Sequence, residues 1–383
     1  MSRVLIYRDQ LLPYSETFIS AQADSLSDYR FVYGGSSRVT STLDNQQAIV
    51  IDELSGQLWK GLYKWGSIAP PDWFATIRSQ YPDIVHAHFG SDGGLVWPVC
   101  QRLNIPLVVT CHGYDVTWQM RNWHSIRSWD DIFRTLLLSK RDLALAKASR
   151  VIAVSQFIRD QLLSLGTAEE KVVVHYIGVD RQRFSPKKIQ RQPMVLFVGR
   201  LVEKKGVEYL IQAMAHVQRQ QPDVELVIIG DGPLRSQLQT LAEQLSVRVR
   251  FLGKQPPEQV RHWMNCAQVF CGPSIVADSG DAEGFGMVFV EAQAMGLPVV
   301  SFATGGVTEA VIHGQTGLLA PEKDTAQLTK AIQRLLTDEA LRQKFARAGQ
   351  AHVAKKFDLH KNTRQLETIY DEVIADSLAL AAS

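Results

Sequence analysis

Short β-branched runs alternate with helix-like segments along this chain, and the alternation occurs in two blocks. Runs with strand character occupy residues 4–7, 30–33, 83–86, 106–110, 150–154 and 172–176 in the first block, and 194–198, 224–229, 247–252, 268–271 and 297–301 in the second. Amphipathic helical spacing follows most of them, as in residues 206–220 and 233–245. Because repeated strand–helix alternation is typical of parallel sheets covered by helices, the sequence predicts two doubly wound, Rossmann-like α/β domains.

A basic, proline-bounded stretch at residues 184–193 separates the two blocks and shows little periodicity. We place the domain boundary there, which gives a first domain at residues 1–188 and a second at 189–358. The total of 383 residues fits two domains of ordinary size. The final segment, 359–383, is expected to form one more helix, at about residues 360–378.

The composition argues against several classes of protein. Lys and Arg number 41 against 39 Asp and Glu, so the net charge of +2 gives no reason to expect a nucleic-acid partner. The four cysteines have no pair at two-residue spacing, which disfavours a disulfide framework and fits a cytoplasmic setting. No export signal and no membrane-spanning stretch are predicted from the sequence.

Two cations follow the first strand of the second block. Residues 194–206 read as a buried strand that ends in a glycine turn before a helix, with Arg200 and Lys205 near the helix start. A guanidinium, an ammonium and a helix N-terminus together favour binding of a diphosphate. The alternative is a solvated loop, in which Lys204 and Lys205 beside Glu203 simply face water.

A pair of acids, Glu283 and Glu291, brackets the start of a later helix. Gly284 and Gly286 allow a ligand to approach the backbone closely and leave amide N–H groups free at the helix start. The helical rise puts the two acids on the order of 10 Å apart, wider than the roughly 5 Å of retaining glycosidases, so a hydrolase is disfavoured. In the alternative interpretation Glu283 only complements the helix dipole and Glu291 is an ordinary exposed residue.

Several motifs occur in one order along the chain: residues 198–206, 229–234, 283–298 and 305–309, with weaker landmarks at 83–88, 112–113, 154–155 and 178–184. In this order they closely resemble the family 4 retaining glycosyltransferases, which have the GT-B fold and include enzymes that build bacterial exopolysaccharides such as colanic acid. The likeness covers almost the whole chain. It implies two Rossmann-like domains facing across a cleft, with the first binding the acceptor, the second the nucleotide sugar, and a C-terminal helix returning to the first domain.

The resemblance also implies roles for individual residues. Arg200 and Lys205 would hold the donor diphosphate, Glu291 would bond the ribose hydroxyls, and Glu283 would bond the donor sugar. By the same likeness His112 would lie beside the reacting centre. Backbone amides at the start of the acidic helix would complete the donor contacts, at Gly284, Phe285, Gly286 and Met287.

One segment departs from the family pattern. The glycine-rich loop usual near the N-terminus is replaced by residues 11–18, and we expect Ser15 at a helix start, together with Glu16, to stand in for it.

The expected mechanism follows from charge. Breaking the bond between the anomeric carbon and the nucleoside diphosphate leaves negative charge on the β-phosphate, where Arg200, Lys205 and a helix N-terminus would stabilise it. The sequence contains no Asp-x-Asp motif, so no divalent metal and no other cofactor is expected. Retention of the anomeric configuration, by same-face attack in which the leaving phosphate takes the acceptor's proton, is implied by the resemblance alone.

Two further features have two interpretations each. His86 and His88, with Asp83 and Asp92, could bind a metal, but a buried or edge role for these histidines is preferred. Gly230 lies in a Gly-Asp-Gly turn that resembles a nucleotide contact and is also an ordinary turn.

Basic and aromatic residues interleave over residues 118–150. Such a stretch suits either a core-facing amphipathic helix or a surface that docks on anionic lipid at the cytoplasmic face of the inner membrane.

The sequence thus predicts a cytoplasmic glycosyltransferase that moves a sugar from a UDP- or GDP-sugar to an acceptor hydroxyl. The acceptor is expected to be a growing surface polysaccharide or a lipid-linked oligosaccharide. A soluble disaccharide or glycogen-type synthase, a nucleotide-sugar epimerase, and a catalytically silent nucleotide-sugar binding module are the alternatives.

Overall fold

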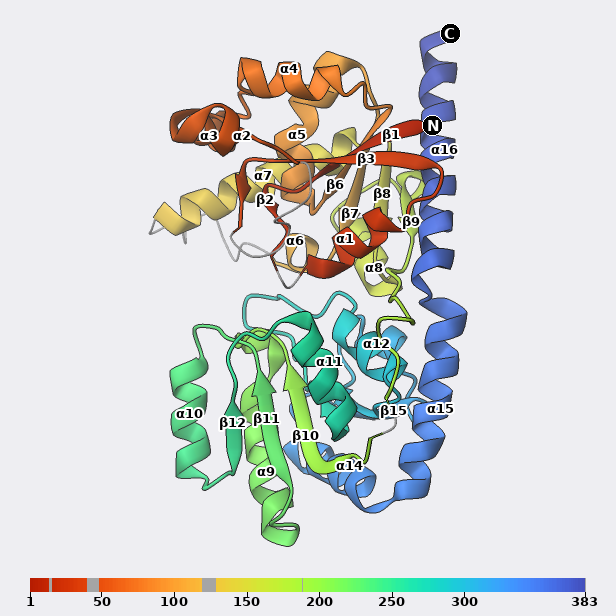
Figure 1. The fold of residues 1–383 in the computed structure, drawn as a ribbon. Coiled ribbons are helices and arrows are strands. Elements are labelled where there is room, and N and C mark those ends of the chain that lie inside the picture. Colours follow the sequence, from red (N-terminus) through yellow and green to blue (C-terminus); the bar gives the residue numbers. More distant parts are fainter. Residues whose placement is uncertain (14–15, 40–47, 119–128, 188, 383) are drawn as a thin grey trace. The chain divides into compact units, whose positions relative to one another are not determined.

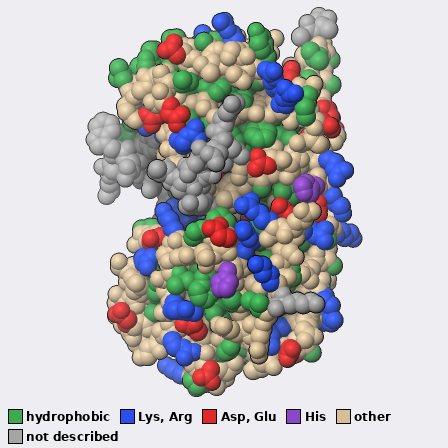
Figure 2. Space-filling view, in the orientation of Figure 1, with side chains coloured by type: hydrophobic (Ala, Val, Ile, Leu, Met, Phe, Trp, Pro, Cys, Tyr) green, Lys and Arg blue, Asp and Glu red, His purple; other side chains and the backbone are tan. Residues whose placement is uncertain are grey.

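The computed structural model describes residues 1–13, 16–39, 48–118, 129–187 and 189–382. Contacts divide the chain into two compact units (Figure 1). Unit 1 comprises Met1–Gly178 together with Leu359–Ser383, and unit 2 comprises Val179–Asp358. Acidic and basic side chains both appear on the visible surface of each unit (Figure 2), as expected for a nearly balanced net charge.

Unit 1 is built on a seven-stranded parallel sheet with the order β5-β3-β1-β6-β7-β8-β9. Its strands are β1 (Ser2–Tyr7), β3 (Tyr29–Gly35), β5 (Ala48–Val50), β6 (Ile84–His88), β7 (Leu107–Cys111), β8 (Arg150–Ala153) and β9 (Val172–Val174). Two short strands, β2 (Gln10–Leu11) and β4 (Ser37–Arg38), pair separately. The helices of this unit are α1 (Thr17–Asp24), α2 (Ile51–Leu54), α3 (Gly56–Gly66), α4 (Pro71–Ser79), α5 (Gly90–Leu103), α6 (Tyr114–Thr117), α7 (Trp129–Lys147), α8 (Gln156–Ser164) and α16 (Leu359–Ala382), with a 3₁₀ turn at Glu169–Lys171.

Unit 2 is a six-stranded parallel sheet with the order β12-β11-β10-β13-β14-β15. Its strands are β10 (Gln192–Val198), β11 (Glu225–Ile229), β12 (Val249–Phe251), β13 (Ala267–Cys271), β14 (Val299–Phe302) and β15 (Gly317–Ala320). Its helices are α9 (Val207–Gln220), α10 (Arg235–Gln244), α11 (Pro257–Cys266), α12 (Met287–Ala294), α13 (Val307–Ala310), α14 (Thr325–Thr337) and α15 (Glu339–Lys356). The central strands are buried on both faces, which explains their continuous apolar runs.

These two sheets confirm the predicted α/β architecture. In unit 2 the strand order reverses between β10 and β13, and in unit 1 it reverses between β1 and β6. At such a switch point the loops leave neighbouring strands in opposite directions, and ligands of doubly wound proteins bind at the carboxyl ends of the strands there. The short strands β5 and β15 were not among the predicted ones, because each offers only a few residues of pattern.

The boundary between the units lies between Gly178 and Val179, earlier than the residue 188 expected from composition. Val179 donates its amide to the carbonyl of Phe357 at 2.8 Å, and the amide of Lys187 donates to Asn265 Oδ1 at 2.9 Å. The basic stretch taken for a linker is therefore packed against unit 2 by its backbone.

The terminal helix α16 packs on the core of unit 1. Leu366, Tyr370 and Val373 lie in the same buried cluster as the β1 side chains Val4 and Ile6. The helix is also held by polar contacts, because Glu367 accepts the backbone amides of the segment before β3, Ser27 at 2.6 Å and Asp28 at 2.7 Å. α16 therefore belongs to unit 1 although it is the last element of the chain.

We expect Glu367→Ala to lower the free energy of local opening of α16 by about 2–3 kcal/mol, because two backbone amides lose a charged acceptor. Glu367 is only 3% exposed, so water cannot fully replace it. Hydrogen exchange of the α16 amides measures the effect, and the exposed Glu372→Ala on the same helix is the matched control. Equal protection in the two variants would contradict this account.

Candidate active site

In unit 2 the loops that follow β10 and β13 are joined to each other at the switch point. The amide of Ile275 donates to the carbonyl of Lys204 at 2.8 Å. Gly206, with φ +58°, lies so close to Pro273 that a Cβ would come within 2.0 Å of its carbonyl oxygen. The glycine predicted at the start of α9 is thus required twice, by its left-handed backbone and by this close approach.

An ion pair between Lys205 and Glu283 connects the same two loops through their side chains. The carboxylate of Glu283 also accepts a hydrogen bond from Ser274 Oγ at 3.4 Å. Burial raises the pKa of Glu283, but Lys205, Lys204 and the two hydrogen bonds lower it more, so this pKa lies below its ordinary value. The two residues assigned to the donor sugar and diphosphate therefore share one charged, partly enclosed site.

The neighbouring charges are paired as well. Lys204 Nζ lies 2.9 Å from Asp281 Oδ1, and Glu203 Oε1 accepts the amide of Asp278 at 2.8 Å. The interpretation in which Lys204 and Lys205 simply face water is therefore wrong. These pairs hold the turn at Glu203–Lys205 against the loop after β13, and the sequence analysis did not find Asp281 or Ser274 as partners.

Arg200 lies in the loop after β10 and is exposed. Its guanidinium has no hydrogen-bond or ion-pair partner among the residues that the structure describes. The backbone beside it is fixed, because the amide of Leu201 donates to the carbonyl of Asp231 at 2.9 Å. An unpaired cation on a fixed backbone is available for an anionic ligand.

Gly230 has a packing role at the end of β11. Its φ is +133°, and a Cβ there would lie 1.9 Å from the carbonyl oxygen of Gly199. Gly230 therefore lets the ends of β10 and β11 approach, which also brings the following turn near Arg200.

The residues before α12 offer backbone to a ligand. Gly286, the N-cap of α12, has φ +85°, and Met287 is the first helical residue. The side chain of Phe285 is buried and its ring packs at 5.1 Å from that of Phe357, so only its backbone can contact a ligand. A Cβ on Gly306 would lie 2.0 Å from the carbonyl oxygen of Gly284, so this loop rests directly on the backbone of the loop after β14.

Glu291 lies inside α12, one helix turn beyond its start, and is partly exposed. Burial raises the pKa of Glu291 to about 7, and the positive charge of Arg261 opposes this rise. Such a group changes its charge within the physiological pH range.

In unit 1 the expected residue His112 follows β7 and is partly exposed. Burial, with smaller contributions from His86 and Arg8, lowers the pKa of His112 to about 3, so the ring is neutral. Its Nε2 lies 3.0 Å from His88 Nδ1. His86 is held at both ring nitrogens, by Tyr370 OH and Thr110 Oγ1, each at 2.6 Å, and so has no free nitrogen for a metal.

The N-terminal loop is only partly described, and Ser15 lies outside the described residues. Glu16 is buried and forms a two-pronged pair with Arg8, at 2.8 and 3.0 Å. Arg8 also pairs with Asp92 at 2.7 Å and lies over the ring of Phe89 at 4.4 Å. Arg8 was not among the residues predicted from the sequence, although its position directly after the first strand was the available signal.

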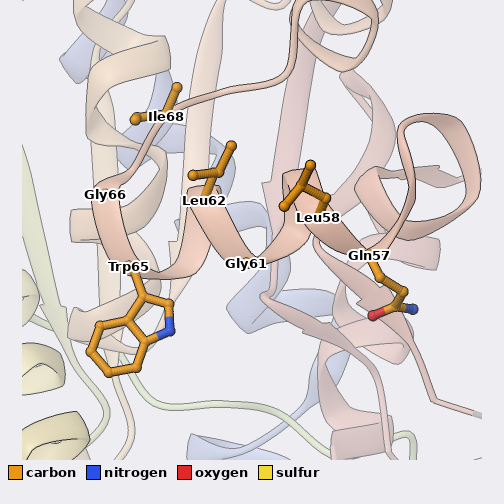
Figure 3. Close-up of a pocket in the computed structure, with 7 residues that line it drawn as sticks. All are labelled: Gln57, Leu58, Gly61, Leu62, Trp65, Gly66 and Ile68. Carbon is orange, nitrogen blue, oxygen red and sulfur yellow. The ribbon is translucent and has the colours of Figure 1, made fainter.

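A shallow apolar pocket follows one face of α3 (Figure 3). None of the expected site residues lines it. Its apolar members include Leu58, 77% exposed, and Trp65, 49% exposed, on the same face of the helix. The lining residues are Gln57, Leu58, Gly61, Leu62, Trp65, Gly66 and Ile68.

The basic and aromatic stretch at residues 118–150 is described only in part, because residues 119–128 lie outside the described ranges. Within the described part of the chain, no helix combines the length and the apolar character needed to cross a membrane.

Two doubly wound parallel α/β sheets are the architecture of the GT-B class of glycosyltransferases, and the comparisons show that this chain has that fold. HepE of Anabaena, solved with UDP and glucose, superposes with a TM-score of 0.77 at 23% identity, over 97% of this chain and 100% of that one. Residues 178–352 match the family described as glycosyl transferases group 1, and residues 37–183 match glycosyltransferase family 4.

Sequence relatives lead to the same family. The amylovoran biosynthesis glycosyltransferase AmsK of Erwinia amylovora is 31% identical over 298 residues, which cover 76% of this chain and 70% of AmsK. The putative colanic acid biosynthesis glycosyltransferase WcaL of Salmonella typhimurium is 28% identical over 301 residues, or 76% of this chain and 71% of WcaL. The chain belongs to the family 4 glycosyltransferases and is related to the enzymes of exopolysaccharide biosynthesis.

Proposed function

We propose that this glycosyltransferase transfers a sugar from a UDP- or GDP-sugar with retention of configuration, and that no divalent metal takes part. The acceptor is a hydroxyl of a growing surface polysaccharide or a lipid-linked oligosaccharide. The observation that carries the proposal is the Lys205–Glu283 ion pair at the switch point of unit 2, beside Arg200, whose guanidinium has no partner in the described part of the chain. A UDP-sugar donor is consistent with the structural neighbour HepE, which was solved with UDP.

The roles follow from the chemistry of the side chains. An ammonium has three N–H donors, so Lys205 can keep its bond to Glu283 and still donate to a phosphate oxygen. Arg200 adds a planar two-pronged donor for the second phosphate. Glu283 accepts a hydroxyl of the sugar, and Glu291 accepts the ribose hydroxyls, while the amides at Gly286 and Met287 add donors at the start of α12.

In the proposed reaction the bond from the anomeric carbon to the β-phosphate oxygen breaks, and a bond from the same carbon to the acceptor oxygen forms on the same face. The acceptor proton passes to the departing phosphate oxygen, so no separate base is needed. Arg200 and Lys205 stabilise the negative charge that develops on that phosphate, and His112 acts beside the reacting sugar. Because these cations are fixed parts of the chain, they take the place of a bridging metal ion.

We further propose a cytoplasmic protein that contacts anionic membrane peripherally. The basic and aromatic stretch at residues 118–150 supports this proposal, and the apolar face of α3 adds support, since amphipathic helices suit a membrane surface. We expect the protein to sediment with anionic vesicles at low salt and to be released from them by high salt. If the protein did not bind the vesicles at low salt, this proposal would be contradicted. A soluble glycogen-type or disaccharide synthase is the alternative that such a result would favour.

Donor hydrolysis tests the enzymatic proposal without knowledge of the acceptor. We expect slow release of UDP or GDP from a panel of nucleotide sugars in the presence of EDTA, and its loss in Arg200→Ala. A silent binding module would bind a nucleotide sugar tightly and never turn it over. If EDTA abolished turnover and added magnesium restored it, the metal-free mechanism would be contradicted.

The pKa of Glu291 leads to a pH dependence of nucleotide binding. Above pH 7 the carboxylate is charged and accepts the ribose hydroxyls well, whereas below pH 7 it becomes protonated and the contact weakens. We expect affinity for the nucleoside diphosphate to rise between pH 6 and pH 8, by roughly tenfold at most. Calorimetry on the parent and on Glu291→Gln separates this effect from titration of the phosphate, because only the parent should show the extra rise.

A further inference from the structure

Three imidazoles lie in contact at the carboxyl ends of β6 and β7. His86 and His88 are two residues apart on β6 and share one face of the strand, and His112 follows the neighbouring strand β7. The ring centroids of His86 and His88 are 4.4 Å apart, and those of His88 and His112 are 5.2 Å apart. The metal interpretation involved His86 and His88 but not His112, and the proposed reaction uses only His112.

The contact between the last two rings has the geometry of a hydrogen bond. His88 Nδ1 and His112 Nε2 are 3.0 Å apart, which is within hydrogen-bond distance, and the two ring planes differ by 21°. The ring of His112 is further confined by two phenylalanines, Phe89 at 4.6 Å and Phe18 at 5.2 Å between centroids. His112 therefore has one defined orientation.

Both rings are neutral. Burial lowers the pKa of His88 well below its ordinary value and that of His112 to about 3. A neutral imidazole carries one N–H, so in the His88–His112 contact one ring donates and the other accepts. Only one of the two nitrogens of His112 bears the proton. Whether Nε2 is protonated in this contact therefore decides whether Nδ1 is a donor or an acceptor.

The ring of His88 is held in one position. It is 2% exposed, and its neighbour His86 is fixed by Tyr370 of α16 and Thr110 of β7. Because its ring packs against that of His86, His88 presents Nδ1 to His112 from one fixed position.

We propose that His88 is a positioning residue, which selects one tautomer of His112 and so sets the hydrogen-bonding character of the nitrogen that His112 offers to a hydroxyl of the transferred sugar. His88 does not touch the substrate in this account. The proposal rests on the proposed function in one respect, namely that His112 acts beside the reacting sugar. A hydroxyl can donate or accept, and a fixed tautomer orients it one way only.

Two variants of His88 separate positioning from packing. His88→Leu keeps an apolar side chain of similar size and removes the nitrogen, whereas His88→Asn keeps a polar atom near the place of Nδ1 that can donate or accept. We expect kcat for donor turnover to fall roughly 10- to 100-fold in His88→Leu, with the donor KM nearly unchanged, and to recover largely in His88→Asn. His216→Leu, at an exposed position of α9, is the control substitution.

Nitrogen NMR of the histidine rings supplies a readout that does not depend on activity. We expect a single tautomer of His112 in the parent and a mixture in His88→Leu. A parent with no donor turnover would overturn the proposed function, while the NMR result would still support or refute the control of His112 by His88. Unchanged kcat in a folded His88→Leu, or an unchanged single tautomer, would overturn this inference.

Discussion

Replacing Lys205 by alanine is expected to lower kcat for donor turnover by about 100- to 1000-fold, the size of loss typical when one fixed donor to a developing negative charge is removed. Lys205 also neutralises Glu283, a residue that is only 9% exposed and whose carboxyl pKa is lowered first by Lys205 and then by Lys204. Without Lys205 the pKa of Glu283 should rise, and the hydroxyl contact of the donor sugar should weaken as well. The substitution therefore affects both the leaving phosphate and the sugar.

The measurement is steady-state release of the nucleoside diphosphate from a sugar donor, with folding checked by thermal melting. Lys330→Ala, at an exposed position of α14, removes the same charge outside the site and should leave kcat unchanged. If Lys205→Ala kept more than half of the parent's kcat, the assigned role of this ammonium would be wrong.

The second large effect is expected from Gly306→Ala, although Gly306 has no side chain to lose. An added Cβ would lie 2.0 Å from the carbonyl oxygen of Gly284 and 2.9 Å from Phe285 Cα, so the backbone before α12 must move. The amide of Gly306 also donates to the carbonyl of Glu283 at 2.9 Å, and the displacement would stretch this bond. We expect donor turnover to fall roughly 10- to 100-fold, because small misplacements of reacting groups are costly.

Overpacking of this kind should cost about 1–3 kcal/mol of stability, which leaves unit 2 folded. Gly61→Ala is the matched control, since a Cβ on Gly61 of α3 meets nothing within 4 Å. A crystal structure of Gly306→Ala should show residues 283–286 shifted away from the loop after β14. Full activity with an unshifted loop would mean that this backbone contact does not position the donor site.

The fold was largely predictable from local pattern. Strands such as β10 and β11 are buried on both faces, so their apolar runs are continuous and visible in the sequence. The boundary at residue 188 was misplaced for a physical reason, because a basic and proline-bounded composition looks like a linker even where its backbone bonds to a domain. The pairing of Val179 with Phe357 joins residues far apart in sequence, and no local pattern reports it.

The site was predictable in part. Arg200, Lys205 and Glu283 were singled out because charged residues beside glycines at strand ends are unusual and their spacing resembles a known family. Their pairing was not visible, since the bond between Lys205 and Glu283 spans two separate loops. Arg8 was overlooked for the same reason, because its partner Asp92 lies on α5, beyond several intervening elements.

Calorimetric titration of a nucleoside diphosphate and of the matching monophosphate tests most directly whether Arg200 and Lys205 hold the diphosphate. The parent should bind the diphosphate at least roughly tenfold more tightly than the monophosphate, because the second phosphate adds charge-assisted bonds to these two side chains. The double variant with Arg200→Ala and Lys205→Ala should bind both nucleotides with nearly the same affinity. A preference for the diphosphate that survives unchanged in the double variant would contradict the account.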